Sequence, residues 1–243
     1  MKLIFNADDF GLTPGVNSGT VEASLHGVVR SATMLIGMPA EQDALTHLQQ
    51  APPLRVGLHL RFTTGRPFTS GASLMTPQGC CWPKEQIYQY QGFKESEVAD
   101  EIETQIAAFH RLGITLSHLD SHHHAHCHPQ ILPVVREIAA SHRLMLRADS
   151  DNPKAQDCRY HFSHQFYDQD ASIDTLLKLV DEHSSQCDVL EVMCHPAYVD
   201  KALQESSGYA IERDRERQIL TDSRLLAELD QRGVELCDFS VFD

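Results

Sequence analysis

The chain has 243 residues, of which 42% are hydrophobic and 22% charged, and its formal net charge is −14. This balance is typical of a folded globular protein and excludes a largely disordered chain. The negative charge argues against a protein that binds nucleic acid or an anionic membrane unaided, since both would repel it.

Seven short apolar runs are predicted to form strands, and segments of helical period separate most of them. The predicted strands are Leu3–Asn6, Ala32–Gly37, Val56–Leu60, Thr115–Leu119, Leu144–Arg147, Val189–Met193 and Val234–Phe239. This alternation is typical of an α/β protein with a parallel sheet covered by helices. The length suits one α/β barrel or two small domains, and because the composition does not change along the chain we expect a single domain over residues 1–243.

End signals place several helices between these strands. Thr13 and Pro14 supply an N-cap and a first helical residue, and Gly27 ends that helix. Apolar residues recur at three- and four-residue steps between Ser96 and Gly113, and further helices are expected over 129–141 and 213–232. Two long stretches, 63–91 and 148–170, lack such a pattern, and irregular stretches of that length are usually functional.

The opening residues and the cysteines both bear on the cellular compartment. The opening residues, MKLIFNADDFG, contain no apolar stretch of signal-peptide length, and no run approaches the roughly 18 apolar residues of a membrane span. The seven cysteines are an odd number without zinc-ribbon spacing. We expect a cytoplasmic protein with reduced thiols.

The candidate reactive side chains all follow predicted strands. They are Asp8 and Asp9 after the first strand, His59 at the end of the third, Asp120 with His122, His123, His124, His126 and His128 after the fourth, Arg147 ending the fifth, and Cys194 and His195 after the sixth. Barrels and open α/β sheets both assemble their active sites at the carboxyl ends of strands. The pattern therefore predicts one polar site built from several strands.

Each of these residues also has a simpler explanation. An aspartate after a strand often caps the next helix, and a lone histidine in an apolar strand, such as His59, is more often a hydrogen-bonded core residue. Arg147 fits a surface position, His195 fits a turn before Pro196, and Cys194 fits a buried thiol. Histidine tracts are usually solvated tails, but this one lies between a predicted strand and a predicted helix, which favours an ordered site.

Together the residues supply a hydrolytic metal site. Such a site needs about three protein ligands and an open position, commonly two imidazoles and one carboxylate. Asp9, His59 and one clustered histidine fit. If the chain stays extended after the fourth strand, Asp120, His122 and His124 face the same side, and His122 is the expected third ligand because it is nearest the strand. His124 and His126 are then expected behind the ligands or against the substrate.

A base and an acid are available beside this metal set. Asp8 adjoins the ligand carboxylate and is the expected general base, with Arg147 and the metal lowering its pKa. His195 comes from another strand and is the expected general acid. This arrangement suits cleavage of an amide. The histidines favour Zn²⁺, although Mg²⁺ is also plausible.

Four segments resemble a known family. NADDFGLTPGVN at 6–17, GLHLRFTTGRP at 57–67, HLDSHHHAH at 118–126 and LEVMCHPAYVD at 190–200 resemble the YdjC-like carbohydrate deacetylases, and most closely their ChbG-type branch of chitooligosaccharide (chitin disaccharide) deacetylases. The resemblance spans nearly the whole chain in order. Two departures are Ala125, where a larger aliphatic residue is common, and the loop Thr76–Gly92, which leaves the preferred oligomer length open.

The resemblance implies a fold, a reaction and roles for residues. It implies a single-domain (β/α) barrel-like fold with about seven parallel strands, related to distorted TIM barrels, and a homodimer. It implies one divalent metal, Mg²⁺ in the family's description, held by Asp9, His59 and His122, with Asp8 as base and His195 as acid. The implied reaction removes the N-acetyl group from N-acetylglucosamine in short chitooligosaccharides such as diacetylchitobiose and releases acetate.

Three aromatic residues are candidates for binding a sugar, and four other functions are alternatives. Aromatic faces commonly bind sugars, and Trp82, Tyr198 and Phe68 are the candidates. The alternatives are a hydrolase acting on a different N-acetyl sugar, a 2-His-1-carboxylate Fe(II) oxygenase, a phosphoesterase and a metal store. The acidic balance and the lack of a glycine-rich phosphate loop disfavour the phosphoesterase.

Overall fold

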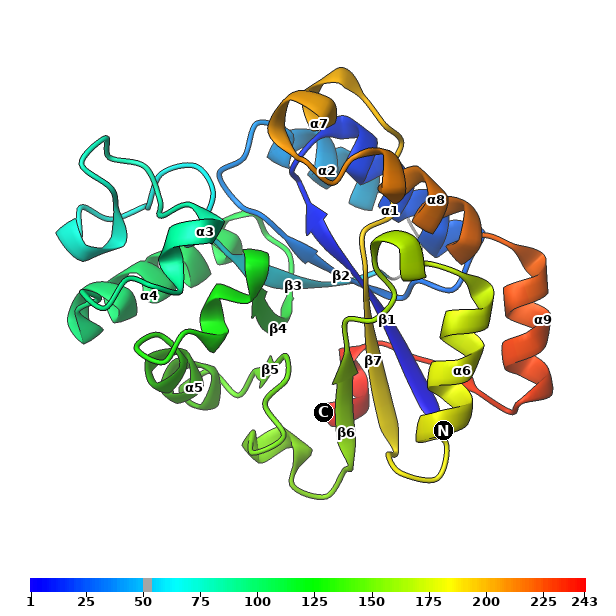
Figure 1. Ribbon diagram of the computed structural model, residues 1–243. Helices are drawn as coiled ribbons and strands as arrows, with labels where there is room; N and C mark the ends of the chain where they lie inside the picture. The colour runs from blue at the N-terminus through cyan, green and yellow to red at the C-terminus, as the bar shows by residue number, and fades with distance from the viewer. Residues whose placement is uncertain (50–53) are drawn as a thin grey trace.

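A curled sheet of parallel strands forms the centre of the molecule (Figure 1). The structure is a computed structural model and describes residues 1–49 and 54–243. The strand order is β5-β4-β3-β2-β1-β7-β6, and β8 pairs with the start of β1. The strands are β1 (Lys2–Phe10), β2 (Ser31–Met34), β3 (Arg55–Leu60), β4 (Leu116–Ser121), β5 (Met145–Leu146), β6 (Tyr160–Ser163), β7 (Val189–Cys194) and β8 (Glu235–Leu236).

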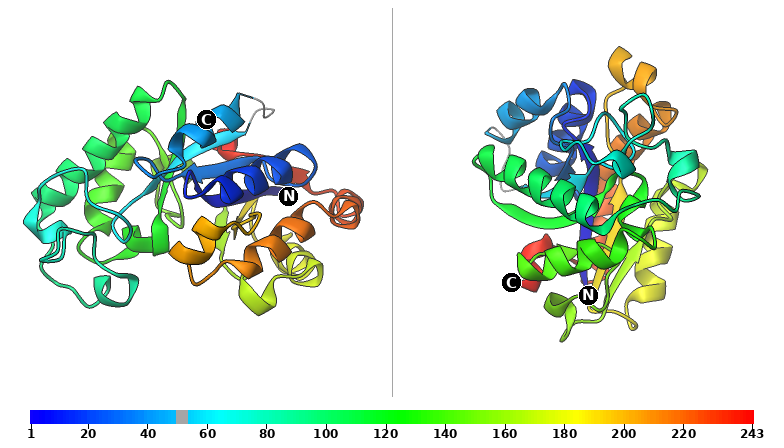
Figure 2. Two further views of the ribbon diagram at one scale, coloured as in Figure 1. Left: turned by 90° about the horizontal axis from the view of Figure 1, so that it is seen from above. Right: turned by 90° about the vertical axis from the view of Figure 1, so that its left-hand side faces the viewer.

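Helices surround this sheet, as the further views in Figure 2 show. They are α1 (Pro14–Leu25), α2 (Glu41–Leu48), α3 (Lys84–Ile87), α4 (Glu95–Arg111), α5 (Leu132–Ser141), α6 (Ile173–His183), α7 (Lys201–Ser206), α8 (Ile211–Leu220) and α9 (Ser223–Gln231). Amphipathic helices such as α4 direct Val98, Ile102, Ile106 and Phe109 into the main core. Within the described residues, no helix has both the length and the apolar character to cross a bilayer.

The predicted fold class is confirmed. The chain is an α/β protein whose parallel sheet curls into part of a barrel, with seven strands along the main path from β5 to β6 and β8 paired with β1. All seven predicted strands are present, although the last shrinks to Glu235–Leu236. One strand was missed: β6 lies in a stretch predicted to be irregular, because Tyr-His-Phe-Ser is too short and too polar to give a periodic signal.

Two predicted helix boundaries were wrong. The single helix expected over 213–232 is two helices, because the side chain of Asp222 accepts from the backbone N–H of Arg224 and begins α9. The helix expected from residue 129 begins at Leu132, because a 3-10 turn over His122–Cys127 and the turn after it occupy the preceding residues. The N-cap at Thr13 is confirmed, since its hydroxyl accepts from the backbone N–H of Val16.

Candidate functional site

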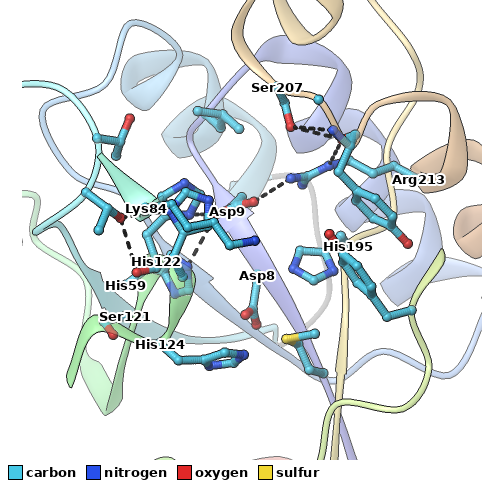
Figure 3. Close-up of a pocket in the computed structure, with 18 of the residues that line it drawn as sticks. Asp8, Asp9, His59, Lys84, Ser121, His122, His124, His195, Ser207 and Arg213 are labelled. Atoms are coloured by element: carbon cyan, nitrogen blue, oxygen red, sulfur yellow. Dashed lines mark hydrogen bonds and ion pairs between the residues drawn. The ribbon is translucent and has the colours of Figure 1, made fainter. Parts of the chain in front are cut away.

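The carboxyl ends of several strands meet at one cavity of about 720 Å³ (Figure 3). Asp8 and Asp9 reach it from the end of β1, His59 from β3, His122 from the turn after β4, and His195 from the segment after β7. A cavity of this volume accommodates a ligand the size of a short oligosaccharide. The predicted convergence of these side chains is therefore seen in the structure.

A bulge in β1 lets two consecutive aspartates face the same cavity. The pairing of β1 with β2 shifts register between Ala7 and Phe10, and Asp9 has a left-handed backbone with φ of 68°. In a regular strand, neighbouring side chains point to opposite faces. The left-handed conformation costs a non-glycine residue free energy, so the surrounding structure must hold it, as is common at functional sites.

Asp9, His59 and His122 lie within coordination reach of one point. Each offers one ligand atom, and these atoms all lie within 4.8 Å of one another. Nδ1 of His122 donates to Oδ1 of Asp9 at 2.8 Å, and Nε2 of His59 lies 3.3 Å from the same oxygen. The other oxygen, Oδ2, accepts from Nη2 of Arg213 at 2.7 Å. Oδ1 is therefore the oxygen that both imidazoles share.

His59 is oriented by groups behind it. Its Nδ1 donates to Oδ1 of Asp120 at 2.6 Å, and the hydroxyl of Thr33 donates to Oδ2 of Asp120 at 2.9 Å. Burial by itself lowers the pKa of His59, but the carboxylates of Asp120, Asp9 and Asp8 outweigh it and raise that pKa to about 10. The carboxylate behind the ring directs Nε2 toward Asp9, as in metal sites where a carboxylate supports a ligating histidine.

The donor set and the local charge both fit a divalent cation. One carboxylate and two imidazoles suit a catalytic metal with an open position. The buried carboxylates of Asp8, Asp9, Asp120 and Glu191 are matched by only two guanidinium groups, those of Arg147 and Arg213. Metal binding requires neutral imidazoles, so the ion must displace the proton that the raised pKa of His59 favours. The site then carries two negative charges, which a divalent ion would balance. A second grouping of Asp8, His59 and Asp120 already holds the guanidinium of Arg147 between its carboxylates.

Arg147 lies under the cavity and binds three carboxylates. Its side chain has 0% exposure, and it donates to both oxygens of Asp8 at 2.6 and 2.7 Å. It also contacts Asp120 at 2.8 Å and Glu191 at 2.6 Å. Burial raises the pKa of Asp8, but the charge of Arg147 and its hydrogen bonds outweigh this and hold that pKa well below the usual range. Asp8 is therefore ionised, and Arg147 acts on it from behind without lining the cavity.

His195 lies on the opposite side of the cavity from the ligand histidines (Figure 3). Its ring makes edge contacts with Tyr167 and Tyr209, each at 5.7 Å between centroids. These two tyrosines stack on each other at 4.1 Å and also line the cavity. The polar ring of His195 and the aromatic pair thus form one wall.

Of the predicted substrate-binding residues, one lines the cavity and the others do not. His124 lines the cavity, whereas His126 is buried beneath it, with Nδ1 against the hydroxyl of Ser121 at 2.6 Å. Trp82 does not line it: its ring stacks on Tyr90 and its indole N–H donates to the carbonyl of Ser73.

The other two aromatic candidates are also absent from the cavity lining. Tyr198 is covered on one face by Arg217, whose guanidinium carbon lies 4.1 Å from the ring centroid. Phe68 packs under Arg61 in the same way, at 4.9 Å. None of the three aromatic candidates, Trp82, Tyr198 and Phe68, is therefore among the residues that line the cavity.

The extended conformation after β4 that made His122 the expected third ligand is not found. The chain does not stay extended after β4: it enters a 3-10 turn in which His123 and His124 have left-handed φ values of 55° and 53°. His122 still reaches Asp9 because it is the first residue after the strand. The hydroxyl of Tyr88 lies 2.9 and 2.8 Å from the carbonyl oxygens of His123 and His124, which braces this turn.

Several residues of the site were not predicted from the sequence. The residues that contact the predicted ones or line the cavity are Arg213, Tyr167, Tyr209, Glu191 and Glu216. Arg213 and Glu216 occur in the highly charged segment IERDRER, where nothing separates an inward-facing charge from a solvated one. The charge of Glu191 inside an apolar strand was a usable signal, because buried strands rarely carry an unpaired carboxylate.

Comparison with known proteins gives full-length matches. The model of the family "YdjC-like protein" matches residues 2–231. A carbohydrate deacetylase of Vibrio cholerae is 47% identical over 241 residues, which cover 99% of this chain and 96% of that protein. One from Geobacillus stearothermophilus is 38% identical, with 98% and 97% covered. A crystal structure of an Enterococcus faecalis protein, named for a proposed role in cellobiose-phosphate cleavage, has a TM-score of 0.90 at 33% identity, with 99% and 98% covered.

Proposed function

Because the chain belongs to the YdjC-like family, whose similar members are carbohydrate deacetylases, we propose that it is a metal-dependent amidohydrolase that removes the N-acetyl group from short chitooligosaccharides. Its substrate on this proposal is an N-acetylglucosamine unit of an oligomer such as diacetylchitobiose, and acetate is released. The observation that carries the proposal is the convergence of Asp9, His59 and His122, with Asp8 and His195 lining the same cavity.

The chain's own residues divide the work of hydrolysis. A divalent ion held by Asp9, His59 and His122 would supply a Lewis acid for the acetyl carbonyl and lower the pKa of water. Asp8 accepts the proton of the attacking water, and Arg147 keeps Asp8 ionised for this purpose. His195 donates a proton to the departing amine nitrogen from the other side of the cavity.

The remaining expectations belong to the same proposal. We propose a single catalytic domain over residues 1–243, a cytoplasmic location and a homodimer. Neither nucleic acid nor a membrane is an expected partner, since the net charge is −14. The tyrosine pair Tyr167 and Tyr209 replaces Trp82 and Tyr198 as the proposed aromatic surface for the sugar, with His124 beside the metal ligands.

The test is acetate release from N-acetylglucosamine, its dimer and its trimer. Enzyme treated with a chelator is expected to be inactive. Zn²⁺ and Mg²⁺ are then added separately, and the ion that restores activity identifies the metal. Absence of acetate with all three sugars would contradict the proposed substrate, and other N-acetyl sugars would then be assayed. Acetate release under nitrogen excludes an oxygenase, which requires O₂.

Two variants test the roles of the adjacent aspartates. Asp8→Asn is expected to retain the metal and lose at least about 100-fold in kcat, the usual range for a general base. Asp9→Asn is expected to lose metal and activity together. If metal-replete Asp8→Asn hydrolyses diacetylchitobiose at the wild-type rate, the base assignment is wrong.

A further inference from the structure

Helix α8 carries a buried carboxylate that the proposed reaction does not use. The side chain of Glu216 has 0% exposure, which is rare for glutamate unless polar groups compensate it. One oxygen, Oε2, accepts from the backbone N–H of His195 at 2.5 Å. The other, Oε1, accepts from the hydroxyl of Tyr209 at 2.5 Å. Both contacts place the charge of Glu216 next to His195.

The imidazole of His195 faces this carboxylate with one nitrogen. Its Nδ1 lies 3.7 Å from Oε1 of Glu216, is buried and has no hydrogen-bond partner. This distance is too long for a hydrogen bond but short for an ion pair. The ring lines the cavity, so the nitrogen on its far side, Nε2, is left toward the substrate space.

We infer that Glu216 is the positioning residue for His195: it holds Nδ1–H toward its own carboxylate and stabilises the protonated ring, so that Nε2 carries the proton needed by the leaving amine. This inference rests on the proposed function, in which His195 is the general acid. As the C–N bond breaks, the proton on Nε2 passes to the amine nitrogen. The neutral ring keeps its Nδ1–H, which still faces Glu216, and regains the Nε2 proton from solvent.

Glu216 brings a carboxylate close to this ring. The titratable groups that face or influence His195 come from several elements, and they are Asp8 at the end of β1, His124 after β4, Tyr167 before α6, Tyr209 before α8 and Glu216 within it. Among the described residues, Glu216 is the only one whose carboxylate lies within ion-pair distance of a ring nitrogen of His195. Asp8 is already paired with Arg147.

The direct test is the titration of His195, monitored by NMR. The protein is histidine-labelled and loaded with Zn²⁺ or Mg²⁺, both of which are diamagnetic. His195→Gln identifies its signal. In Glu216→Gln, which preserves size and an acceptor for the backbone N–H, the titration midpoint of His195 is expected to lie below that of the wild type, because the carboxylate 3.7 Å from Nδ1 is gone. Asp214→Asn is the matched control, because it removes a carboxylate from the same helix that pairs with Arg217 outside the cavity. An unchanged midpoint in Glu216→Gln would overturn the inference.

A second variant gives the opposite sign and covers the case in which Glu216→Gln does not fold. Tyr209→Phe removes the hydroxyl that occupies Oε1 of Glu216 and leaves that oxygen free for Nδ1 of His195. The midpoint of His195 is then expected to rise. A fall in this variant would overturn the inference, because it would show that the hydroxyl rather than the carboxylate stabilises the protonated ring.

Kinetics separate this inference from the proposed function. In Glu216→Gln, kcat/KM for diacetylchitobiose is expected to fall about 10- to 100-fold with the metal content unchanged. Hydrolysis of p-nitrophenyl acetate is expected to change less than about threefold, because nitrophenolate leaves without a proton from His195. Equal losses with both substrates would contradict a role through the acid. If the wild type deacetylates no sugar, the proposed function fails, and the NMR midpoints still decide the role of Glu216.

Discussion

Asp120 shows how a side chain outside the cavity can control a ligand within it. It lies opposite His59 in the pairing of β4 with β3, and its Oδ1 accepts from Nδ1 of that ring at 2.6 Å. Its other oxygen accepts from Thr33 and contacts Arg147. Because these contacts leave Asp120 no freedom to turn, the ring of His59 is held with Nε2 toward Asp9.

Replacing Asp120 by asparagine should therefore weaken metal binding without removing a ligand. In Asp120→Asn we expect the dissociation constant of the metal to rise about 10- to 100-fold, the usual effect of losing a carboxylate behind a ligating histidine. Competition with a chromogenic chelator measures it. Asp188→Asn is the control, since Asp188 pairs with Arg159 on the surface. An affinity in Asp120→Asn equal to that of the control would show that Asp120 does not support the ligand.

Among single residues, the reactive side chains were easier to predict from the sequence than the contacts between side chains. Five residues were predicted because their types and their positions after predicted strands suggest catalysis. All five line the cavity: Asp8, Asp9, His59, His122 and His195. The aromatic residues were not predictable in the same way. A tyrosine at a cavity and a tyrosine on the surface have the same sequence signal, and tertiary packing alone separates them.

At the scale of elements, two glycines on α1 allow the segment that carries His195 to lie against the helix. A Cβ on Gly19 would lie 2.5 Å from the backbone of Ala197, and one on Gly15 would lie 2.1 Å from the carbonyl oxygen of Tyr198. Neither distance is possible for real atoms. The segment after β7 is thus packed directly on the backbone of α1, and its position depends on the absence of side chains there.

Gly19→Ala should move this segment and impair the reaction while leaving the metal in place. The clash is with backbone rather than with a flexible side chain, so we expect a destabilisation of about 1–3 kcal/mol and a lower kcat. Urea unfolding and acetate release measure the two effects, and Ser18→Ala on the same helix is the control. Wild-type stability together with wild-type kcat in Gly19→Ala would refute the packing argument.

Element boundaries were predictable only where a local signal exists. Thr13 and Pro14 predict the start of α1, and the periodic apolar residues of α4 predict a helix. The turn over His122–Cys127 has no such signal, because its two left-handed residues are histidines rather than glycines. The contacts of Tyr88 from a distant loop hold these residues there, and a sequence does not display contacts of that kind.

At the scale of the whole molecule, negative charge is concentrated at the cavity as well as on the surface. The net charge is −14, and the buried carboxylates around the metal ligands outnumber their arginines by two. Burying unbalanced charge is costly, and without an ion a proton on His59, whose pKa is raised to about 10, offsets only one of these two charges. The same charge that argues against nucleic acid as a partner therefore favours a divalent cation.

Binding of the metal should consequently stabilise the whole fold. An ion that binds the folded chain alone, at about 100 times its dissociation constant, contributes about 2.7 kcal/mol. For a chain of this size that corresponds to a rise in Tm of about 5–10 °C, measurable by calorimetry with and without a chelator. Asp9→Asn should show almost no rise, because a neutral amide replaces the carboxylate that both imidazoles contact. A wild-type Tm that is the same in chelator and in saturating Zn²⁺ or Mg²⁺ would show that neither ion binds the fold at this site.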